Sequence, residues 1–528
     1  MIPPGVLALG SAVLLVLSFP NCNQPWCAWV ALVPWLVLLR RAAAREAFWW
    51  SYAIGVAFFL GSMWWLTHVT FVGLLVLCVY LALYFAAFGL ITQRVLCHHP
   101  SPITHHLVVI PSIWVAMEFL RSHVLSGLGW NLLAYSQSPW RSVIQIADMT
   151  GAWGVSFLIV LVNVALAGLP GFGRRTARSW LALPVAAGCV AGVLGYAVWR
   201  VPQVGGGQIV RVAVVQGNIP QDEKWDVAFV AKILDHYETL TRTAAATQPA
   251  LIVWPETSVP GYLGIDEAIT QRMTRLARTV QRPLLVGSPV PTLTGGRVTL
   301  MNSAMLIDDA GQFAGRYDKL HLVPFGEFVP FEQAVPWLRT ILPPIGEFSP
   351  GHEYTVFTLP VKSSEFRVAS SNSQPATHNS QLRFSVLICF EDMFPEMARR
   401  FVRQGARLLL VITNDAWFGP TAAAYQHAQA STFRAVELRV PVARAANTGW
   451  SGCIDPTGRW IGGVRQAQTG AELFVDGTHT CELPLGGAAS AYLRWGDWFA
   501  LLCLFGSLGW SVTQLRTGRH GAGSRAHG

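Results

Sequence analysis

Three polar residues, Glu256, Lys319 and Cys389, lie where strand-like apolar runs end or loops begin. Glu256 ends the run LIVWPE, Lys319 lies in GRYDKLHLVPFGEFVP, and Cys389 ends FSVLIC. A thiol becomes a strong nucleophile once it ionises, and a carboxylate nearby can accept its proton. A lysine beside it favours the thiolate and can stabilise the oxyanion that forms when sulfur attacks a carbonyl. These residue types predict covalent acyl-transfer chemistry with Cys389 as the nucleophile.

Each of these residues also has an ordinary structural interpretation. A single cysteine at the end of a strand is usually a small buried side chain. Glu256 could be a charge at the start of a helix, since Thr257 is a good capping residue. Lys319 could form a surface ion pair with Asp318 or Asp308, which is the usual situation of a lysine.

The region from 206 to 485 has the pattern of an α/β layer structure, which would hold these side chains in place. Short β-rich runs alternate there with helical patterns, and side chains at the ends of buried strands are held rigidly. The Ser- and Asn-rich stretch at 363–381 predicts a flexible surface insert just before the cysteine strand. Predicted strands cover 211–219, 251–255, 283–290, 384–390, 407–414 and 442–447, and predicted helices cover 228–246 and 265–280.

The rest of the chain is strongly apolar. Of its 528 residues, 52% are hydrophobic and only 13% are charged, against about 25% charged in a typical soluble protein. Apolar segments lie at 5–19, 25–39, 48–67, 72–93, 107–120, 152–171, 180–199 and 497–514. They predict a polytopic α-helical membrane domain of about eight transmembrane helices.

We therefore expect three parts in the chain. Residues 1–205 form an N-terminal transmembrane domain of about seven helices. Residues 206–485 form the α/β domain that carries the chemistry. Residues 486–528 form a C-terminal transmembrane helix and a tail.

The net charge of +9 does not indicate nucleic-acid binding, because the arginines lie in short runs between apolar segments. Positive loops stay in the cytoplasm, so both termini are expected there and the region 206–485 on the outer side. Arg121 and Arg141 lie in a loop that is expected outside. They reduce the excess of positive charge in the cytoplasmic loops but do not reverse it. The arginines that set the topology are Arg40, Arg41, Arg45, Arg94, Arg174, Arg175, Arg178, Arg516, Arg519 and Arg525.

The nine cysteines show no CxxC pair and no metal-type spacing. An odd number in so apolar a sequence predicts neither a disulfide framework nor a metal site. Glu118, which lies in or at the end of a membrane segment, is costly in lipid. It is therefore a candidate for a paired or functional residue.

Several motifs in a fixed order resemble those of a known enzyme family. They are EFLRSHVLSGLGWNLLAYSQ (118–137), VWPET (253–257), RYDKLHLVPFGEFVP (316–330), LICFED (387–392), NDAWFG (414–419) and RAANTGWSG (444–452). Their surroundings resemble the nitrilase superfamily of Glu-Lys-Cys amidases, whose fold is an αββα sandwich. With the flanking membrane segments, nearly the whole chain resembles the apolipoprotein N-acyltransferase family. Phe390, where that family commonly has Tyr, and the long insert at 363–381 depart from the pattern.

The resemblance implies a role for each site residue. Glu256 would be the general base, Lys319 the oxyanion stabiliser and Cys389 the nucleophile. Glu327 matches a further carboxylate that the family needs, and Glu391 matches the acidic residue two places after the nucleophile. For these last two, a purely structural salt bridge remains an alternative.

The resemblance also implies a reaction and a location. Cys389 would take an acyl chain from a membrane phospholipid as a thioester. The α-amine of the S-diacylglyceryl cysteine of an apolipoprotein would then accept it. No cofactor, metal or nucleic acid is implied. The protein would be a multi-pass protein of the bacterial inner membrane with its catalytic domain on the periplasmic side.

The segment 321–348 is rich in Phe, Pro and Leu and has no helix or strand period. It predicts a mobile lid over Cys389 that admits acyl chains and excludes water. An ordinary packed loop is the alternative. Candidate substrate-binding residues are Phe325, Phe328, Trp337 and Trp417.

Three other functions compete with this interpretation. One is an inactive binding relative, against which the full Glu-Lys-Cys set argues. A membrane-tethered amidase would explain the Glu-Lys-Cys set but not the many apolar segments, because one helix is enough to anchor a domain. A transporter would place several charged residues inside the spans. Glu118 is the single candidate for such a residue.

Overall fold

The chain divides into two compact units. The helical unit comprises Met1–Arg200 and Arg494–Gly528, and the α/β unit comprises Val201–Leu493. The structure, a computed structural model, describes residues 2–98, 103–169, 181–204, 206–294, 296–329, 347–361, 366–368, 380–486 and 488–523.

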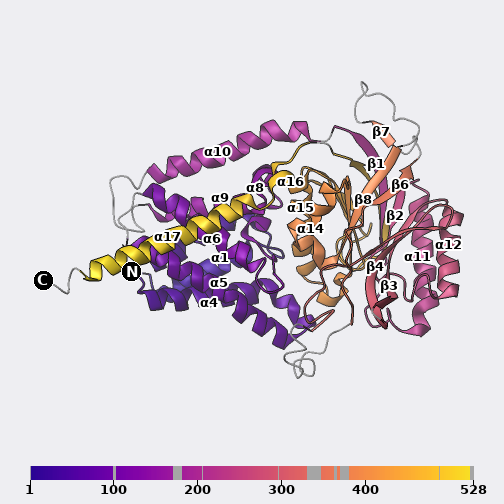
Figure 1. The fold of residues 1–528 in the computed structure, drawn as a ribbon, viewed down its shortest axis with the longest axis horizontal. Coiled ribbons are helices and arrows are strands. Elements are labelled where there is room, and N and C mark those ends of the chain that lie inside the picture. The colour runs from indigo at the N-terminus through magenta and orange to yellow at the C-terminus, as the bar shows by residue number, and fades with distance from the viewer. Residues whose placement is uncertain are drawn as a thin grey trace. The chain divides into compact units, whose positions relative to one another are not determined.

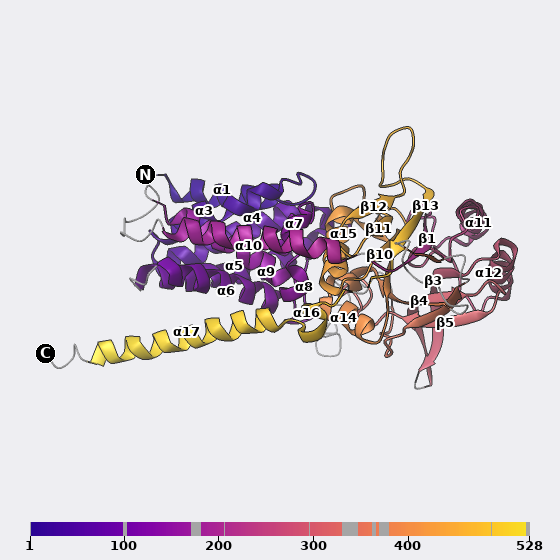
Figure 2. The same cartoon turned by 90° about the horizontal axis from the view of Figure 1, so that it is seen from above.

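The helical unit is a bundle in which α4 packs along α5, and α6 packs against α9 and α17 (Figures 1 and 2). Its helices are α1 (Pro4–Leu17), η1 (Pro25–Cys27), α2 (Ala28–Ala31), α3 (Val33–Leu39), α4 (Ala44–Met63), η2 (Trp64–His68), α5 (Phe71–His98), α6 (Ile103–Arg121), η3 (Leu133–Gln137), α7 (Arg141–Ile144), α8 (Ala147–Thr150), α9 (Ala152–Ala167), α10 (Ala182–Arg200) and α17 (Trp498–Gly523). The short α16 (Ala491–Trp495) leads from the α/β unit into α17.

Within the described ranges, three helical segments are long and apolar enough to cross a membrane: Ala44–His68, Phe71–Cys97 and Ala182–Gln203. Four apolar segments are shorter: Pro4–Leu17, Pro25–Leu39, Ala152–Ala167 and Trp498–Ser511. The prediction of about eight spans is therefore not confirmed. One reason is visible at 25–39, where Pro25 and Pro34 stand at helix starts and the segment breaks into η1, α2 and α3, because proline removes a helical donor.

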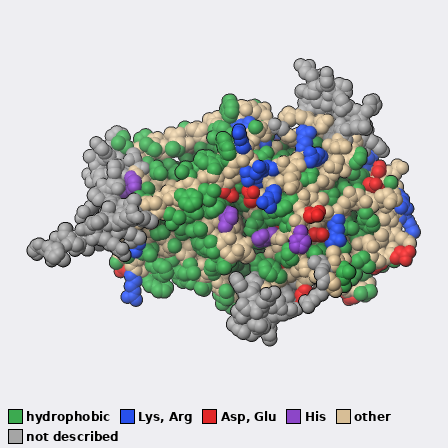
Figure 3. All heavy atoms as spheres, in the orientation of Figure 1, with side chains coloured by type: hydrophobic (Ala, Val, Ile, Leu, Met, Phe, Trp, Pro, Cys, Tyr) green, Lys and Arg blue, Asp and Glu red, His purple; other side chains and the backbone are tan. Residues whose placement is uncertain are grey.

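The face of the helical unit that Figure 3 shows is rich in hydrophobic side chains. Along α5, large side chains at least 41% exposed are Phe71, Val72, Leu75, Val76, Val79 and Leu83. Helices α10 and α17 also expose large apolar side chains: Val198, Trp199, Leu502 and Phe505. Continuous apolar surface of this kind is what contact with lipid requires.

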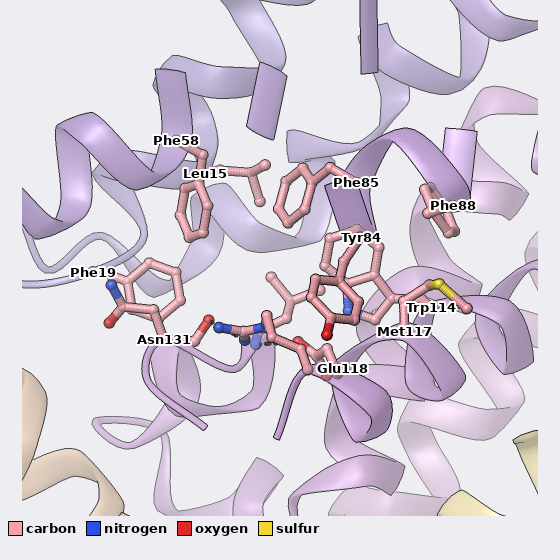
Figure 4. A pocket seen from close by; sticks show the side chains of 12 residues that line it. Leu15, Phe19, Phe58, Tyr84, Phe85, Phe88, Trp114, Met117, Glu118 and Asn131 are labelled. Carbon is pink, nitrogen blue, oxygen red and sulfur yellow. Dashed lines mark hydrogen bonds between the residues drawn. The ribbon is translucent and has the colours of Figure 1, made fainter. Parts of the chain in front are cut away.

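Glu118 and Arg121 are both buried and line one small cavity inside the helical unit (Figure 4). The N–H of Leu133 donates to Glu118 Oε1 at 2.7 Å, and Arg121 Nη1 donates to the carbonyl of Trp130 at 2.7 Å. The two charges also attract each other. Glu118 and Arg121 thus each bind the main chain after α6 and hold this loop against the bundle.

In the described part of the α/β unit, the strands form two sheets. The first has the order β13-β1-β2-β3-β4-β5, with β7 pairing with β1, and the second has the order β12-β11-β10-β9-β8-β6. The first contains β1 (Gln208–Gln216), β2 (Leu251–Val253), β3 (Leu284–Thr294), β4 (Arg297–Ile307), β5 (Phe313–Asp318), β7 (Phe366–Val368) and β13 (Gly477–Pro484). The second contains β6 (Phe357–Val361), β8 (Ser380–Ile388), β9 (Leu408–Thr413), β10 (Val442–Ala446), β11 (Gly452–Ile454) and β12 (Trp460–Gly463).

The two sheets pack face to face between two helical layers. Figure 1 shows α11 (Val230–Ala245) and α12 (Glu267–Val280) on one side of the paired sheets. On the other side lie α14 (Pro395–Arg403) and α15 (Ala423–Leu438). One apolar core joins side chains from both sheets, and a second lies between the first sheet and α11 and α12. This is the αββα sandwich that the resemblance implies.

The sequence of α12 shows how one of these layers forms. Its apolar residues Ile269, Met273 and Leu276 recur at helical spacing and are buried against the first sheet. The side chain of Asp266 caps the helix by accepting from the N–H of Ile269 at 3.2 Å. Full burial of such apolar side chains stabilises the fold by about 1.5–3 kcal/mol each, and the cap adds about 1 kcal/mol.

The predicted strands and helices from 206 to 485 are confirmed in order, with ends shifted by a few residues. The insert prediction is wrong in part, because Phe366–Val368 forms β7 and β8 already begins at Ser380. The rest of 363–379 lies outside the described residues. The sequence analysis missed β4, β5 and α15, which position or support the site.

Cys453 and Cys481 form a disulfide bond, contrary to the expectation of no disulfide framework. Cys453 lies in β11 of the second sheet and Cys481 in β13 of the first. The bond therefore fastens the two sheets of the sandwich to each other, and both cysteines are buried.

We expect the double replacement of Cys453 and Cys481 by alanine to destabilise the α/β unit by about 3–4 kcal/mol. The reason is that the disulfide bond restricts the unfolded chain by closing the loop between the two cysteines. The sequence separation is 28 residues. In thermal unfolding of the full chain in detergent, Tm should fall by on the order of 10 °C. Non-reducing peptide mapping of the wild type should recover one linked Cys453–Cys481 peptide pair, and its absence would contradict the assignment.

Candidate active site

Glu256, Lys319 and Cys389 follow the ends of β2, β5 and β8. Strands β8, β9 and β10 run parallel, so the residues after them meet at one edge of the second sheet. The same edge receives Asn414 after β9. Glu256 and Lys319 follow strands of the first sheet, which packs face to face on the second. Residues far apart along the chain are therefore brought together by strand pairing within each sheet and by packing between the sheets.

Glu256 is 6% exposed and is held through both carboxylate oxygens. Asn302 Nδ2 donates to Oε1 at 2.8 Å, and Lys319 Nζ lies 3.4 Å from the same oxygen. The main-chain N–H of Asn414 donates to Oε2 at 2.9 Å. This carboxylate joins β4 and β5 of one sheet to β9 of the other, and its orientation is fixed before any substrate arrives.

A glycine in β3 makes room for the turn that carries Glu256. A Cβ added at Gly287 would lie 2.5 Å from the carbonyl oxygen of Pro255 and from the nitrogen of Thr257. Thr257 itself has a φ of 46°, a left-handed conformation that costs a non-glycine residue about 1 kcal/mol or more. The backbone of this turn is thus constrained by close packing.

Lys319 is almost completely buried between two carboxylates. Its Nζ lies 2.9 Å from Glu327 Oε2 and 3.4 Å from Glu256 Oε1. Burial alone lowers the pKa of Lys319, but Glu327 and Glu256 outweigh it and raise that pKa above its ordinary value. The ammonium therefore stays charged. Glu327 also accepts from the N–H of Val323 at 2.8 Å and from Asn302 Nδ2 at 3.0 Å.

Cys389 begins the short turn η8 (Cys389–Met393) with a φ of 54°, again a strained left-handed conformation. Glu391 holds this turn, because its carboxylate accepts from the N–H of Ile388 at 2.7 Å. The same carboxylate accepts from the N–H of Leu320 at 2.7 Å and from the Tyr317 hydroxyl at 2.9 Å. Burial raises the pKa of Glu391 to about 7, although these donors favour its charged form. Glu391 thus ties the cysteine turn to the lysine loop.

The Cys389 thiol is protonated at rest. Burial and the Glu256 carboxylate raise the pKa of the thiol well above its ordinary value, and Asp415 acts in the same direction. Lys319 lowers the pKa of Cys389, as expected from the sequence, but its effect is smaller than that of burial or of Glu256. A thiol in this state needs a base to accept its proton before it can act as a nucleophile.

Behind Cys389 lies a fully buried network of charges. His427, on α15, contacts the carbonyl of Cys389 at 3.2 Å and Asp392 Oδ1 at 2.8 Å through Nε2. Its Nδ1 lies 3.0 Å from Asp415 Oδ1. Arg444 binds both carboxylates, at 3.2 Å from Asp392 and 3.1 Å from Asp415. Two cations and two anions thus form a network that contacts the strained Cys389 turn through His427.

The network should make stability depend on pH. Burial and Arg444 lower the pKa of His427, but Asp392 and Asp415 outweigh them and raise it to about 9. Because this value exceeds the ordinary 6.5, the stabilisation by His427 is complete below pH 6.5 and is lost as pH rises through 9. The difference between these two pKa values corresponds to a contribution of up to about 3 kcal/mol to the free energy of unfolding.

We therefore expect His427→Gln to lower the Tm of the detergent-solubilised chain most at pH 6, and progressively less as pH rises to 9.5. Subtracting the variant from the wild type removes the contribution of other groups that titrate in this range. A Tm difference that is the same at pH 6 and pH 9.5 would contradict a charged His427.

Sequence reasoning missed Asn302, Asn414, His427 and the charges that surround it. Asn302 is a polar residue in an otherwise apolar strand, LMNSAML, which is a weak signal for a buried partner. Asn414 and Arg444 lie in motifs that the resemblance quotes, although no role was assigned to them there. His427 stands in the sequence AAYQHAQAST, where no periodicity marks it.

The candidate substrate-binding residues are only partly placed. Phe325 is 40% exposed, with a φ of 62°, and Phe328 accepts from the N–H of Phe325 at 2.7 Å through its carbonyl oxygen. Trp417 lies in the turn η9 (Asp415–Phe418) that follows β9. Trp337 lies outside the described residues, as does most of the predicted lid. Among the residues described, no group of three or more His, Cys, Asp or Glu could hold a metal ion.

Two family models match the chain. Residues 11–165 match the N-terminal domain of apolipoprotein N-acyltransferase, and residues 211–487 match carbon-nitrogen hydrolase. The second match agrees with the two sheets and helical layers of the α/β unit. It covers all of the site residues described above.

The relatives include proteins named apolipoprotein N-acyltransferase. The one from Geobacter metallireducens is 37% identical and covers 95% of this chain and 93% of its own length. The one from Azotobacter vinelandii is 32% identical and covers 99% and 97%. A solved amidase of the nitrilase superfamily from Nesterenkonia is 21% identical, with a TM-score of 0.38 over 55% of this chain and 95% of its own. That last similarity is too low to carry an argument.

Proposed function

We propose a reaction for this chain, which belongs to the apolipoprotein N-acyltransferase family. The protein moves an acyl chain from a membrane phospholipid to the N-terminal amine of apolipoproteins, through a thioester on Cys389. The observation that carries this proposal is that Glu256 and Lys319, after β2 and β5 of the first sheet, lie 3.4 Å apart, and that both act on the charge state of Cys389 after β8 of the second sheet. A half-buried thiol beside a fixed carboxylate and a charged lysine suits covalent acyl transfer.

In the first half of the reaction, the Cys389 sulfur attacks the ester carbonyl of the phospholipid while Glu256 takes the thiol proton. A sulfur–carbon bond forms, and the carbonyl oxygen becomes an oxyanion that the Lys319 ammonium stabilises. When the tetrahedral intermediate collapses, the ester carbon–oxygen bond breaks. The lysophospholipid leaves with the proton from Glu256, and the acyl chain remains on sulfur as a thioester.

In the second half, the α-amine of the S-diacylglyceryl cysteine attacks the thioester carbonyl. Glu256 accepts a proton from the amine, and Lys319 again faces the oxyanion. Collapse breaks the carbon–sulfur bond, forms the amide and returns the proton to Cys389. This is ping-pong catalysis, in which both lipid-anchored substrates use one site in turn.

Glu327 and Glu391 support these steps without taking part in bond changes. Glu327 keeps Lys319 charged and oriented through its contact of 2.9 Å. Glu391 fixes the backbone on both sides of the site, at Ile388 and at Leu320. Their roles are therefore to position the lysine and the cysteine.

For topology, we assign residues 1–205 and 486–528 to a membrane domain of about eight spans and residues 206–485 to the catalytic domain. Both termini are cytoplasmic and the catalytic domain is periplasmic, as the arginine distribution indicates. The Cys453–Cys481 disulfide supports this side, because such bonds persist in oxidising compartments.

Phe325, Phe328 and Trp417 are the apolar side chains that we assign to acyl-chain contact. Phe325 and Phe328 flank Glu327, the partner of Lys319, and Trp417 lies three residues after Asn414, which binds Glu256. An apolar lining here would exclude water from the thioester, which otherwise hydrolyses.

The test supplies the full chain in detergent with a phospholipid that carries a labelled acyl chain, together with a diacylglyceryl-cysteine peptide. The proposal predicts label in the N-acylated peptide, with little free fatty acid. Label found only as free fatty acid would identify a membrane-bound hydrolase instead. An N-acetylated form of the same peptide, which has no free amine, is the matched control and should remain unlabelled.

A further inference from the structure

A second lysine reaches the site, and the reaction above does not use it. Lys224 lies in the loop between β1 and α11 and is 3% exposed. Its Nζ donates to the main-chain carbonyl oxygen of Glu256 at 3.1 Å. The neighbouring Gln221 accepts from Asn414 Nδ2 at 2.8 Å, so this loop packs directly against the residues that hold Glu256.

The ammonium of Lys224 is poorly satisfied by hydrogen bonds. It has three N–H donors, and among the residues that the structure describes the carbonyl of Glu256 is its one hydrogen-bond acceptor. The ammonium also lies over the Trp225 ring, 6.0 Å from its centroid, which is at the outer limit of a cation–π contact. Taking an ammonium out of water with these two partners still costs several kcal/mol. A structural lysine at this position would normally point its head group to solvent. The burial of the Lys224 ammonium therefore needs an explanation in the charges that surround it.

The charges around Cys389 supply that reason. Glu256 and Glu327 share the single cation of Lys319, and Glu391 adds a further acidic group nearby. Without another cation, this buried cluster would carry excess negative charge before the thiol ionises. Attack by the thiolate or formation of the oxyanion would be opposed by that charge.

We infer that Lys224 is a positioning residue of the active site, whose ammonium orients the Glu256 turn through its carbonyl and compensates the negative charge that develops at Cys389. The inference rests on the proposed function, in which Cys389 is the nucleophile and Glu256 its base. Lys319 then stabilises the oxyanion from one side while Lys224 keeps the whole cluster close to neutral.

The compensation should depend on pH in a recognisable way. Burial lowers the pKa of Lys224 to about 8, although Glu256 and Cys389 oppose that shift. Lys224 is therefore charged below about pH 8 and loses its effect above it. The other groups that act on Cys389 are Glu256, Lys319 and Asp415, together with the Thr413 hydroxyl. His427 contacts its carbonyl.

The experiment measures alkylation of Cys389 by iodoacetamide in the full chain, followed on the Cys389 peptide by mass spectrometry. The sulfur–carbon bond forms from the thiolate as iodide leaves, so the rate reports ionisation of the thiol without any substrate. We compare the wild type with Lys224→Met and Lys224→Arg at pH 7 and pH 9.5. Lys232→Met is the control, because its side chain is 68% exposed.

At pH 7 the Lys224→Met rate should be about tenfold below that of the wild type, since loss of one nearby cation raises a thiol pKa by about one unit or more. At pH 9.5 the gap should narrow to about twofold. Lys224→Arg should recover most of the pH 7 rate, and Lys232→Met should match the wild type. Lys224→Gln replaces Lys224→Met if the latter does not fold, as judged by Tm.

Equal rates for the wild type and Lys224→Met at both pH values would overturn the inference. A rate gap of the same size at pH 7 and pH 9.5 would overturn it too, because a purely structural role has no reason to vanish as Lys224 discharges. Neither outcome touches the acyl-transfer proposal. That proposal fails separately, if no N-acylated peptide forms in the labelled-phospholipid assay.

Discussion

Replacement of Cys389 by alanine is expected to reduce N-acyl transfer at least about 10⁴-fold, because no other group can hold the acyl chain between the two half-reactions. The fold should survive the change. Alanine is smaller than cysteine, and the Cys389 carbonyl contact with His427 belongs to the main chain. The measurement is the rate of label transfer to the diacylglyceryl-cysteine peptide, with Tm recorded alongside.

The matched control for this prediction is Cys189→Ala. Cys189 is a free, exposed cysteine of α10 in the helical unit, far in sequence from the site motifs. Its replacement should leave transfer within about twofold of the wild type. Comparable activity in Cys389→Ala and the wild type, with both folded, would remove Cys389 from the mechanism.

Glu256→Gln is expected to slow transfer by about 10²–10⁴-fold, the usual contribution of a positioned general base. The amide cannot accept the proton of Cys389 or of the incoming amine. It also disturbs the site, because both carboxylate oxygens accept from donors: Asn302 and Lys319 on one side, and Asn414 on the other. A glutamine would have to turn its own N–H₂ group toward one of these donors.

Glu223→Gln provides the comparison for the loss of a carboxylate. Glu223 forms a surface ion pair with Lys232 at 3.0 Å, and such pairs contribute about 0–1 kcal/mol. This variant should keep the activity of the wild type. If Glu256→Gln transferred acyl chains at the wild-type rate, the base would have to be another group, and the assignment of Glu256 would be wrong.

The strands that carry the site could be predicted because they are short apolar runs that end in a polar residue. Leu251–Val253 before Glu256 is a buried strand, and β8 is buried from Phe384 to Ile388 before Cys389. Both apolar patterns are visible in the sequence. The topology that closes the gaps between them was not visible. It depends on pairing between β8 and β9 and on packing between two sheets, and local patterns do not record either.

Helix α15 shows the opposite case. Its sequence, AAYQHAQASTFRAVEL, has seven polar or charged residues among sixteen, yet nearly all of it is buried. The polar side chains are satisfied inside the protein, for example His427 by Asp392 and Asp415, and Arg434 by Glu437. Hydropathy cannot identify such a helix, because the groups that satisfy its buried polar side chains lie largely on other elements.

Counting apolar segments also had a physical limit. Hydropathy marked 152–171 as one span, whereas α9 covers Ala152–Ala167, short of the about 20 residues that a straight crossing needs. The disulfide was missed for a related reason. Cys453 and Cys481 lie in different sheets, so their approach is a property of the sandwich and not of their spacing.

The central claim is that Cys389 carries the acyl chain, and one measurement tests it most directly. The wild-type chain is incubated with phospholipid alone, and the Cys389 peptide is analysed by mass spectrometry before and after addition of the diacylglyceryl-cysteine peptide. We predict an acyl adduct on Cys389 that disappears on addition of the amine as N-acylated peptide forms. An adduct that is absent, that resists the amine, or that lies on another residue would contradict the mechanism.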